Sequence, residues 1–138
     1  MPTQATGSFT FANWDETPVA GAEEGPRLAR ASVTNAFSGA IEAAATTCEY
    51  SIAYVDGKTG VFAGHQLFSG SVAGREGTFA VEERGSFGDD GTVHCDFHVV
   101  PGSGTGGLAG LSGTGGYTAR HGEPAVPYTF SYELGDLS

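Results

Sequence analysis

The chain of 138 residues and 14.1 kDa is long enough for one domain with a buried core, and its 39% hydrophobic and 11% aromatic content excludes a disordered chain. Its 16 acidic and 6 basic residues give a net charge of −10. This charge excludes nucleic-acid binding through a basic patch and disfavours an anionic membrane surface. A neutral apolar ligand or another protein remains as a candidate partner.

The amino terminus, MPTQATGSF, has neither a basic head nor an apolar run. No stretch of the chain approaches the ~20 apolar residues of a membrane span. We therefore expect a cytoplasmic protein that does not associate with membranes. In that compartment Cys48 and Cys95 are expected to be free thiols and not a disulfide.

Period-two alternation of apolar and polar residues recurs along the chain, and long stripes of helical period are missing. Turn-forming residues at Asp56–Lys58, Ala73–Arg75 and Asp89–Gly91 predict hairpin connections. Thr17–Arg27, rich in Gly, Pro and Glu, is expected to be a long loop and a candidate mobile lid. The predicted strands are Gly7–Trp14, Ala31–Ser38, Ala43–Val55, Val61–Phe68, Gly77–Phe87, Thr92–Val100, a short one around Gly116–Ala119, and Tyr128–Leu134.

Seven or eight strands in one small chain predict a closed barrel or a sandwich. There is no internal repeat and no domain boundary, so residues 1–138 are expected to form a single domain. The strands agree on one apolar face, which would line a barrel interior with aromatic rings. This face carries Phe9, Phe11, Val33, Phe37, Tyr50, Ile52, Tyr54, Phe62, Phe68, Phe79, Val81, Phe87, Phe97, Val99, Tyr128, Phe130 and Tyr132.

Glycine is concentrated in the segment Pro101–Tyr117, PGSGTGGLAGLSGTGGY. The spacing of Gly102, Gly104 and Gly107 fits the G-x-G-x-x-G pattern of dinucleotide sites, which requires a helix beginning in the loop. The following residues are too rich in glycine to hold a helix, and no Gly-Lys-Ser/Thr follows. The segment therefore predicts a glycine-kinked crossing between two barrel strands, not a phosphate site.

Several polar residues share the phase of the aromatic face and must find a hydrogen-bond partner if they are buried. Either their polar atoms reach the barrel ends and pair internally, or they orient an apolar ligand inside an aromatic cavity. Glu82 and Glu83 are adjacent, so the phase of the strand decides which carboxylate points inward. The polar residues on the apolar phase are Asn35, Tyr50, Tyr54, Gln66, Glu83, Cys95 and Tyr132.

Five segments together resemble a bacterial family, domain-of-unknown-function 3224. They are Trp14–Glu16, Arg30–Gly39, Glu49–Tyr54, Phe68–Phe79 and, most specifically, Val99–Thr118. The resemblance implies an allene-oxide-cyclase-like, or lipocalin-like, fold: a single closed antiparallel β-barrel of about eight strands. Relatives of that class include allene oxide cyclases, dirigent proteins and polyketide cyclases. Family members usually have Glu where this chain has Gln66.

An aromatic cavity suits a cyclase or isomerase of secondary metabolism that needs no cofactor, because holding a flexible substrate near its reactive conformation removes several kcal/mol of barrier. Glu83 is the candidate acid or base, and Tyr54 and Gln66 are candidate catalytic hydrogen-bond donors to a carbonyl. The rival hypothesis is a non-catalytic barrel that acts by homo-oligomerisation or protein binding. The expected ligand-binding residues are Trp14 (lining or plugging the mouth), Asn35, Tyr50, Phe62, Phe68, Cys95, Phe97 and Tyr132.

No metal site is expected. His94, Asp96 and His98 form a stripe on one strand, but the stripe has the outward phase. Residues four apart on a strand lie ~13 Å from each other, too far to share one ion. We interpret the stripe as a solvated polar face. Cys48 or Cys95 as a catalytic nucleophile is the weaker alternative, because a buried free cysteine is usually a small hydrophobic residue.

Overall fold

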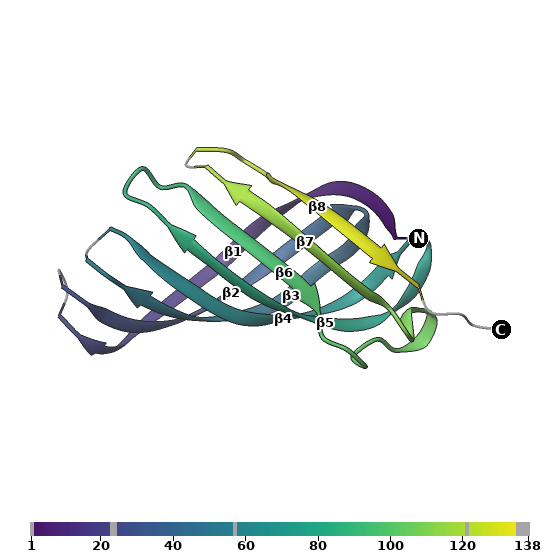
Figure 1. Ribbon diagram of the computed structural model, residues 1–138, viewed down its shortest axis with the longest axis horizontal. Helices are drawn as coiled ribbons and strands as arrows, with labels where there is room; N and C mark the ends of the chain where they lie inside the picture. Colours follow the sequence, from purple (N-terminus) through teal and green to yellow (C-terminus); the bar gives the residue numbers. More distant parts are fainter. Residues whose placement is uncertain (1, 23–24, 57, 121, 135–138) are drawn as a thin grey trace.

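The structure, a computed structural model, describes residues 2–22, 25–56, 58–120 and 122–134. Its eight strands follow one another around a closed antiparallel barrel, in which each strand pairs with the next and β8 pairs with β1 (Figure 1). The expected barrel of about eight strands is confirmed. The strands are β1 Thr3–Gly21, β2 Arg27–Gly39, β3 Ile41–Tyr54, β4 Gly60–Val72, β5 Arg75–Phe87, β6 Val93–Val99, β7 Ser112–Ala119 and β8 Val126–Glu133.

The two ends of the barrel differ. β1 begins and β8 ends at one end, together with the tight β2–β3 and β4–β5 turns and the β6–β7 crossing (Figure 1). We call this the closed end. The β1–β2, β3–β4, β5–β6 and β7–β8 connections lie at the opposite end, which we call the open end.

The expected loop and lid at Thr17–Arg27 is wrong over Thr17–Gly21, because β1 continues as a strand to Gly21. Ala22, Gly25 and Pro26 lie between β1 and β2, and residues 23 and 24 of the expected loop are outside the described residues. β1 pairs with β8 only over Thr3–Phe9, whereas its pairing with β2 extends to the Gly21–Arg27 pair. The far part of β1 is therefore hydrogen-bonded on one side only. An edge position of this kind tolerates Pro18, which has no N–H to donate, so the sequence looked like a loop.

A bulge in β1 reverses the alternation of its side chains. The register with β2 shifts between Ala12 and Asp15, and Asn13 has φ +61°, a conformation that Asn adopts more readily than most residues. Before the bulge Phe9 is buried and Phe11, although 59% exposed, lines the cavity; after the bulge Trp14 lines the same cavity. Aromatic side chains of β1 thus line the barrel as far as the open end, although the bulge interrupts the alternation of inward and outward residues.

The closed-end half of the interior is filled with rings. Phe68 stacks on Phe79 with ring centroids 4.6 Å apart, and Phe37 packs edge-on against Phe68 at 4.8 Å. The inward positions of β2 near the open end are small instead, at Ala29 and Ala31. Both alanines are buried and belong to a second, smaller cluster with Tyr50, Ile52 and Phe62.

The glycine segment forms the β6–β7 crossing, as its composition predicts. It runs along the edge of β5 beyond the end of β6: the Thr105 N–H donates to the carbonyl of Thr78 at 2.9 Å. Gly77 allows this approach, because a Cβ at that position would meet the Thr105 carbonyl oxygen. Leu108, in the three-residue 3-10 turn η1 (Gly106–Leu108), is fully buried in the closed-end core. Among the described residues, no helix is both long and apolar enough to cross a membrane.

Candidate functional site

A cavity of about 570 Å³ occupies the open-end half of the barrel. Its walls are mainly aromatic and aliphatic, whereas its mouth carries charges of both signs. Val33 and Asn35 of β2 line it together with rings from the other strands. The wall residues include Phe9, Phe11, Trp14, Val33, Ile52, Phe62, Phe87 and Val126, and the mouth carries Lys58, Asp89, Arg120 and Glu123.

Two tyrosines form the polar inner end of the cavity. Tyr50 of β3 and Tyr117 of β7 both line it, and their hydroxyl oxygens lie 3.3 Å apart. Asn35 of β2 lines the same region. We call these three residues the floor. The floor is the place where an apolar ligand in this cavity would meet hydrogen-bonding groups.

Glu83 lies directly behind the floor and is 1% exposed. The Tyr50 hydroxyl donates to Glu83 Oε1 at 2.9 Å, and Gln66 Nε2 donates to Glu83 Oε2 at 2.5 Å. The thiols of Cys48 and Cys95 point at the same carboxylate, with Sγ–O distances of 4.0 and 3.7 Å. Four donors from three strands thus surround one buried carboxyl group. Glu83 itself does not line the cavity.

Gln66 is held in one orientation by two other buried side chains. Its Oε1 accepts hydrogen bonds from Asn35 Nδ2 at 2.8 Å and from Thr46 Oγ1 at 2.5 Å. The amide nitrogen must therefore face Glu83. Within the described residues, no buried side-chain nitrogen or oxygen lacks a hydrogen-bond partner. A fully satisfied network of this kind fixes its members in place.

Burial controls the protonation of this cluster. It raises the pKa of Glu83 above the usual 4.5, and the hydrogen bonds from Tyr50 and Gln66 oppose this effect. Burial also raises the pKa values of Tyr50 and Tyr117 well above 10, that of Cys95 to about 12, and that of Cys48 further still. Both phenols and both thiols therefore keep their protons at neutral pH.

A second polar group holds the mouth of the cavity. Glu16 of β1 accepts a hydrogen bond from the Tyr54 hydroxyl at 2.6 Å and another from Trp14 Nε1 at 3.2 Å. The Arg27 guanidinium lies 3.7 Å from the centre of the Tyr54 ring, within the range of a cation–π interaction. The Trp14 indole is 49% exposed, so it lines the mouth and does not plug it.

The structure brings most of the predicted site residues together at the open end. Trp14, Asn35, Tyr50, Tyr54 and Phe62 line the cavity. Gln66, Glu83 and Cys95 form the buried network behind it. Phe68, Phe97 and Tyr132 belong instead to the closed-end core and lie outside the set of cavity-lining residues, because they sit further along their strands.

Sequence reasoning missed four participants: Glu16, Thr46, Cys48 as a neighbour of Glu83, and Tyr117. Tyr117 is the most important of them, because it forms half of the floor. The sequence contained a signal for Tyr117, because this residue belongs to the short strand expected around Gly116–Ala119. Tyr117 and Ala119 are two residues apart, so they share a face of that strand, and both line the cavity. Thr46 and Cys48 share the inward phase of Tyr50 and Ile52, so the alternation of β3 contained their signal too.

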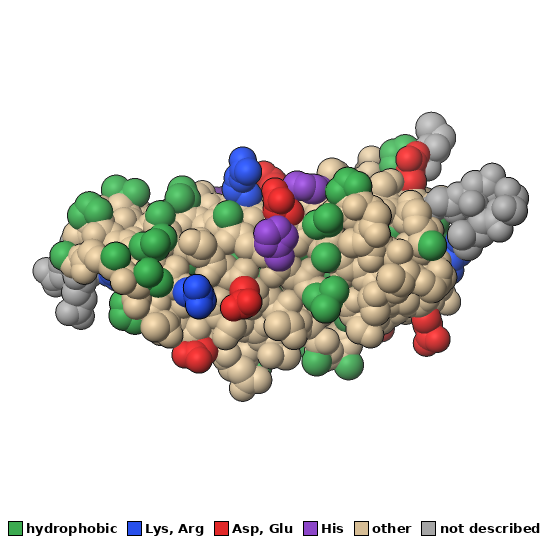
Figure 2. Space-filling view, turned by 90° about the horizontal axis from the view of Figure 1, so that it is seen from below, with side chains coloured by type: hydrophobic (Ala, Val, Ile, Leu, Met, Phe, Trp, Pro, Cys, Tyr) green, Lys and Arg blue, Asp and Glu red, His purple; other side chains and the backbone are tan. Residues whose placement is uncertain are grey.

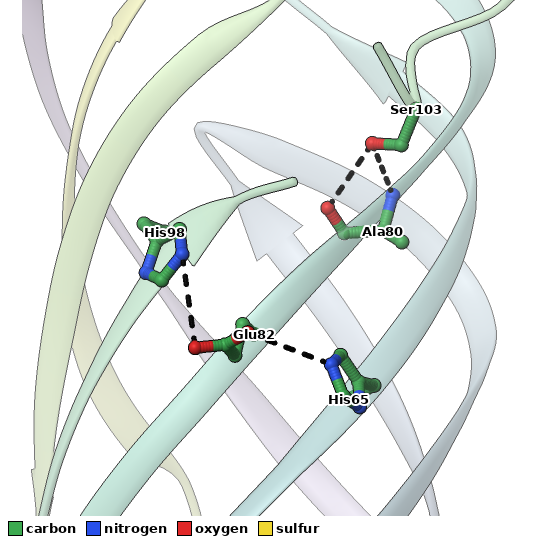
Figure 3. A network of polar contacts seen from close by, with 5 residues as sticks. All are labelled: His65, Ala80, Glu82, His98 and Ser103. Atoms are coloured by element: carbon green, nitrogen blue, oxygen red, sulfur yellow. Dashed lines mark hydrogen bonds and ion pairs between the residues drawn. The ribbon is translucent and has the colours of Figure 1, made fainter. Parts of the chain in front are cut away.

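The outer face carries the charged groups of the central strands. Glu82 lies there between His65 of β4 and His98 of β6, with N–O distances of 3.7 and 3.9 Å (Figure 3). Glu83, not Glu82, is therefore the inward carboxylate. His94, Asp96 and His98 are exposed, and in the described part of the chain no three His, Cys, Asp or Glu residues are placed to hold a metal ion. Figure 2 shows histidines beside acidic side chains near the middle of this surface and hydrophobic side chains gathered toward the open end.

Comparisons with known proteins give a family but no activity. A family model described as "Protein of unknown function (DUF3224)" matches residues 5–132. The chain is similar to the crystal structure of a DUF3224 protein of unknown function from Shewanella oneidensis MR-1, with a TM-score of 0.77 and 27% identity, covering 99% of this chain and 100% of that one. No curated protein matches. The match across nearly the whole chain means that this protein belongs to the DUF3224 family.

Proposed function

We propose that this barrel binds a small apolar molecule in its open-end cavity. The observation that carries the proposal is a cavity of about 570 Å³ with aromatic walls and a hydroxyl pair at its inner end. This volume lies within the usual range of small-molecule sites, and mostly apolar walls with a few convergent polar groups are typical of such sites. The charge of −10 agrees with a neutral ligand.

The enzymatic form of this proposal is a cyclase or isomerase that uses no cofactor. Both reactions rearrange bonds within one substrate, so they need positioning and a proton donor more than an imported group. Tyr50 and Tyr117 would touch a substrate carbonyl, and Glu83 would exchange a proton with Tyr50. The two hydroxyls 3.3 Å apart and the Tyr50–Glu83 hydrogen bond of 2.9 Å support this form. Gln66 and Glu83 would act through the floor, and Tyr54 would act at the mouth. Kinship with the allene-oxide-cyclase-like barrels stays a prediction of the sequence.

The rival, a non-catalytic barrel that binds itself or another protein, draws on a different surface. Leu28, Val55 and Val61 are exposed near the open end, and Leu28 and Val61 flank Ala53 in one outward row of β2, β3 and β4. Size-exclusion chromatography with light scattering separates the two: a stable oligomer that a Val61→Asp substitution dissociates supports the rival.

A matched pair of substitutions tests ligand binding in the cavity. Ala119 lines the cavity, whereas Ala63 is exposed on the outer face of β4. Ala119→Phe should fill part of the cavity and lower the affinity for 2-ethylnaphthalene at least tenfold in calorimetric titrations, while Ala63→Phe should leave it unchanged. Thermal melts would confirm that both variants fold. Equal binding by both variants, or no binding by the parent protein, contradicts the proposal.

A further inference from the structure

The polar inner end of the cavity indicates what chemical group the ligand carries. We propose that the ligand has a carbonyl oxygen that accepts hydrogen bonds from Tyr50 and Tyr117, and that Glu83 sets how many of these bonds the floor can offer. The inference rests on the proposed function, because it concerns the same cavity. Glu83 is a positioning residue in this scheme, since it acts through Tyr50.

The two hydroxyls are arranged to share one oxygen atom. Both line the cavity and lie 3.3 Å apart, and a carbonyl oxygen has two lone pairs with which to accept two donors. Each phenol has a single proton to donate. The number of protons that point into the cavity therefore depends on where the proton of Tyr50 goes.

When Glu83 is ionised, it consumes one of these protons. A carboxylate can only accept, and Tyr50 lies 2.9 Å from Glu83 Oε1. The Tyr50 proton then points away from the cavity. Tyr117 keeps the single proton that a ligand oxygen can use, and even that proton can be given to the Tyr50 oxygen.

When Glu83 is neutral, the direction of the Tyr50 hydrogen bond reverses. Gln66 cannot accept the carboxyl proton, because its own oxygen faces Asn35 and Thr46 and its N–H faces Glu83 Oε2. The remaining acceptors are the Tyr50 oxygen at 2.9 Å from Oε1 and the weakly accepting sulfurs of Cys48 and Cys95, so the carboxyl proton is best placed on Oε1, where it faces the Tyr50 oxygen. Tyr50 becomes the acceptor, and both phenol protons are free for a ligand carbonyl.

The side chains in contact with Glu83 are uncharged, so none of them opposes the protonation of its carboxylate. They are Cys48 and Tyr50 on β3, Gln66 on β4, Cys95 on β6 and Tyr117 on β7. The electrostatic effect of His65, exposed on the outer face of β4, lowers the pKa of Glu83 but is smaller than the effect of burial. Burial raises the pKa of Glu83, so the two-donor state extends above the usual carboxyl range.

A matched pair of probes tests the inference. 2-Acetylnaphthalene has a carbonyl acceptor, whereas 2-ethylnaphthalene has nearly the same shape without one. We expect the acetyl compound to bind about five- to tenfold more tightly at about pH 5, with this preference falling toward pH 8. The affinity for the ethyl compound should not change with pH. Isothermal titration calorimetry measures all four affinities.

Substitutions assign the effect to individual residues. Glu83→Gln should keep the acetyl preference at every pH, because its amide N–H2 faces Tyr50 as a permanent donor. Tyr50→Phe and Tyr117→Phe should each reduce the preference, and Thr114→Val, which removes an exposed hydroxyl from the same strand as Tyr117, should not. If Glu83→Gln does not fold, the pH series on the unaltered protein still decides the matter.

The outcomes separate the two claims. If both probes bind equally at all pH values, or if the acetyl preference does not change with pH, the inference is overturned and the proposed function stands. If neither probe binds, the proposed function fails and the inference fails with it. A pH-dependent preference that also persists in Tyr50→Phe contradicts the role of Tyr50 and overturns the inference.

Discussion

The Tyr50 hydroxyl donates a hydrogen bond of 2.9 Å to the Glu83 carboxylate, although β3 and β5 are not neighbours in the barrel. β4 lies between them, and its Gly64 is the register partner of both residues. A Cβ at Gly64 would collide with the backbone at Glu49, so the close approach of β3 and β4 requires glycine there. The curvature of the barrel thus links a buried acid to the cavity floor.

The pH dependence of stability should reveal the buried acid. Burial raises the pKa of Glu83 in the folded state above the usual 4.5, so the folded protein binds more protons than the unfolded one above that pH. Glu83 therefore contributes a loss of stability as the pH rises from about 4.5 until the folded-state pKa is passed. Chemical unfolding at a series of pH values should show this loss in the natural chain and not in Glu83→Gln. Parallel curves for the two proteins would mean that the folded-state pKa is not raised.

Gln66 should be among the most sensitive positions to a polar-to-apolar change. Gln66→Leu keeps the size of the side chain but leaves Asn35, Thr46 and Glu83 each short of a hydrogen bond in a buried place. We expect a loss of about 2–4 kcal/mol in the free energy of unfolding. Gln4→Leu, at an exposed position of β1, is the matched control and should change stability by less than about 0.5 kcal/mol. Similar losses for the two variants would contradict the network.

The two halves of the interior should respond differently to truncation. Phe68 is 1% exposed and stacked on Phe79, so Phe68→Ala should cost about 3–5 kcal/mol. Phe87 lines the cavity and is only partly buried, so Phe87→Ala should cost clearly less. Urea unfolding of both variants measures the difference. If Phe87→Ala is equally costly, the open-end half is as tightly packed as the closed-end half.

Both cysteines should be unreactive in the folded protein. Cys48 and Cys95 are buried free thiols, and burial next to Glu83 raises the pKa of Cys95 to about 12 and that of Cys48 further. Since the thiolate is the reactive form, Ellman's reagent should label neither thiol until denaturant is added. The unfolded chain supplies the control, because it should react fully. Rapid labelling of one thiol under native conditions would place that cysteine in reach of solvent.

The alternation of apolar and polar residues was enough to predict most of the fold and part of the candidate site. Period-two alternation predicted that Gln66 faces inward, since it continues the phase of its aromatic neighbours, and it placed His94 and Asp96 outside. It gave Glu83 the inward phase but left open whether Glu82 or Glu83 points into the barrel. The bulge at Asn13 could not be predicted in this way, and neither could the one-sided pairing of β1, because it depends on β8 beginning only at Val126, opposite Phe9.

The cavity itself depends on distance across the barrel, which no local pattern contains. Val33, Tyr50 and Ile52 are ordinary inward residues of their strands, and only the closed barrel shows that they surround a cavity. Tyr117 was assigned to a strand but not to a site. The sequence alone did not show that the strands on either side of the barrel would bring its hydroxyl to that of Tyr50.

The central claim is that a small apolar molecule binds inside the open-end half of the barrel. The most direct test is a nuclear magnetic resonance titration of the isotopically labelled protein with 2-ethylnaphthalene, read residue by residue. We predict saturable shifts of the backbone amides of Val33, Ile52 and Tyr117, with those of Phe79 and Val72 in the filled half unchanged. Shifts confined to outward residues such as Leu28 and Val61, or no saturable shifts, would contradict the account.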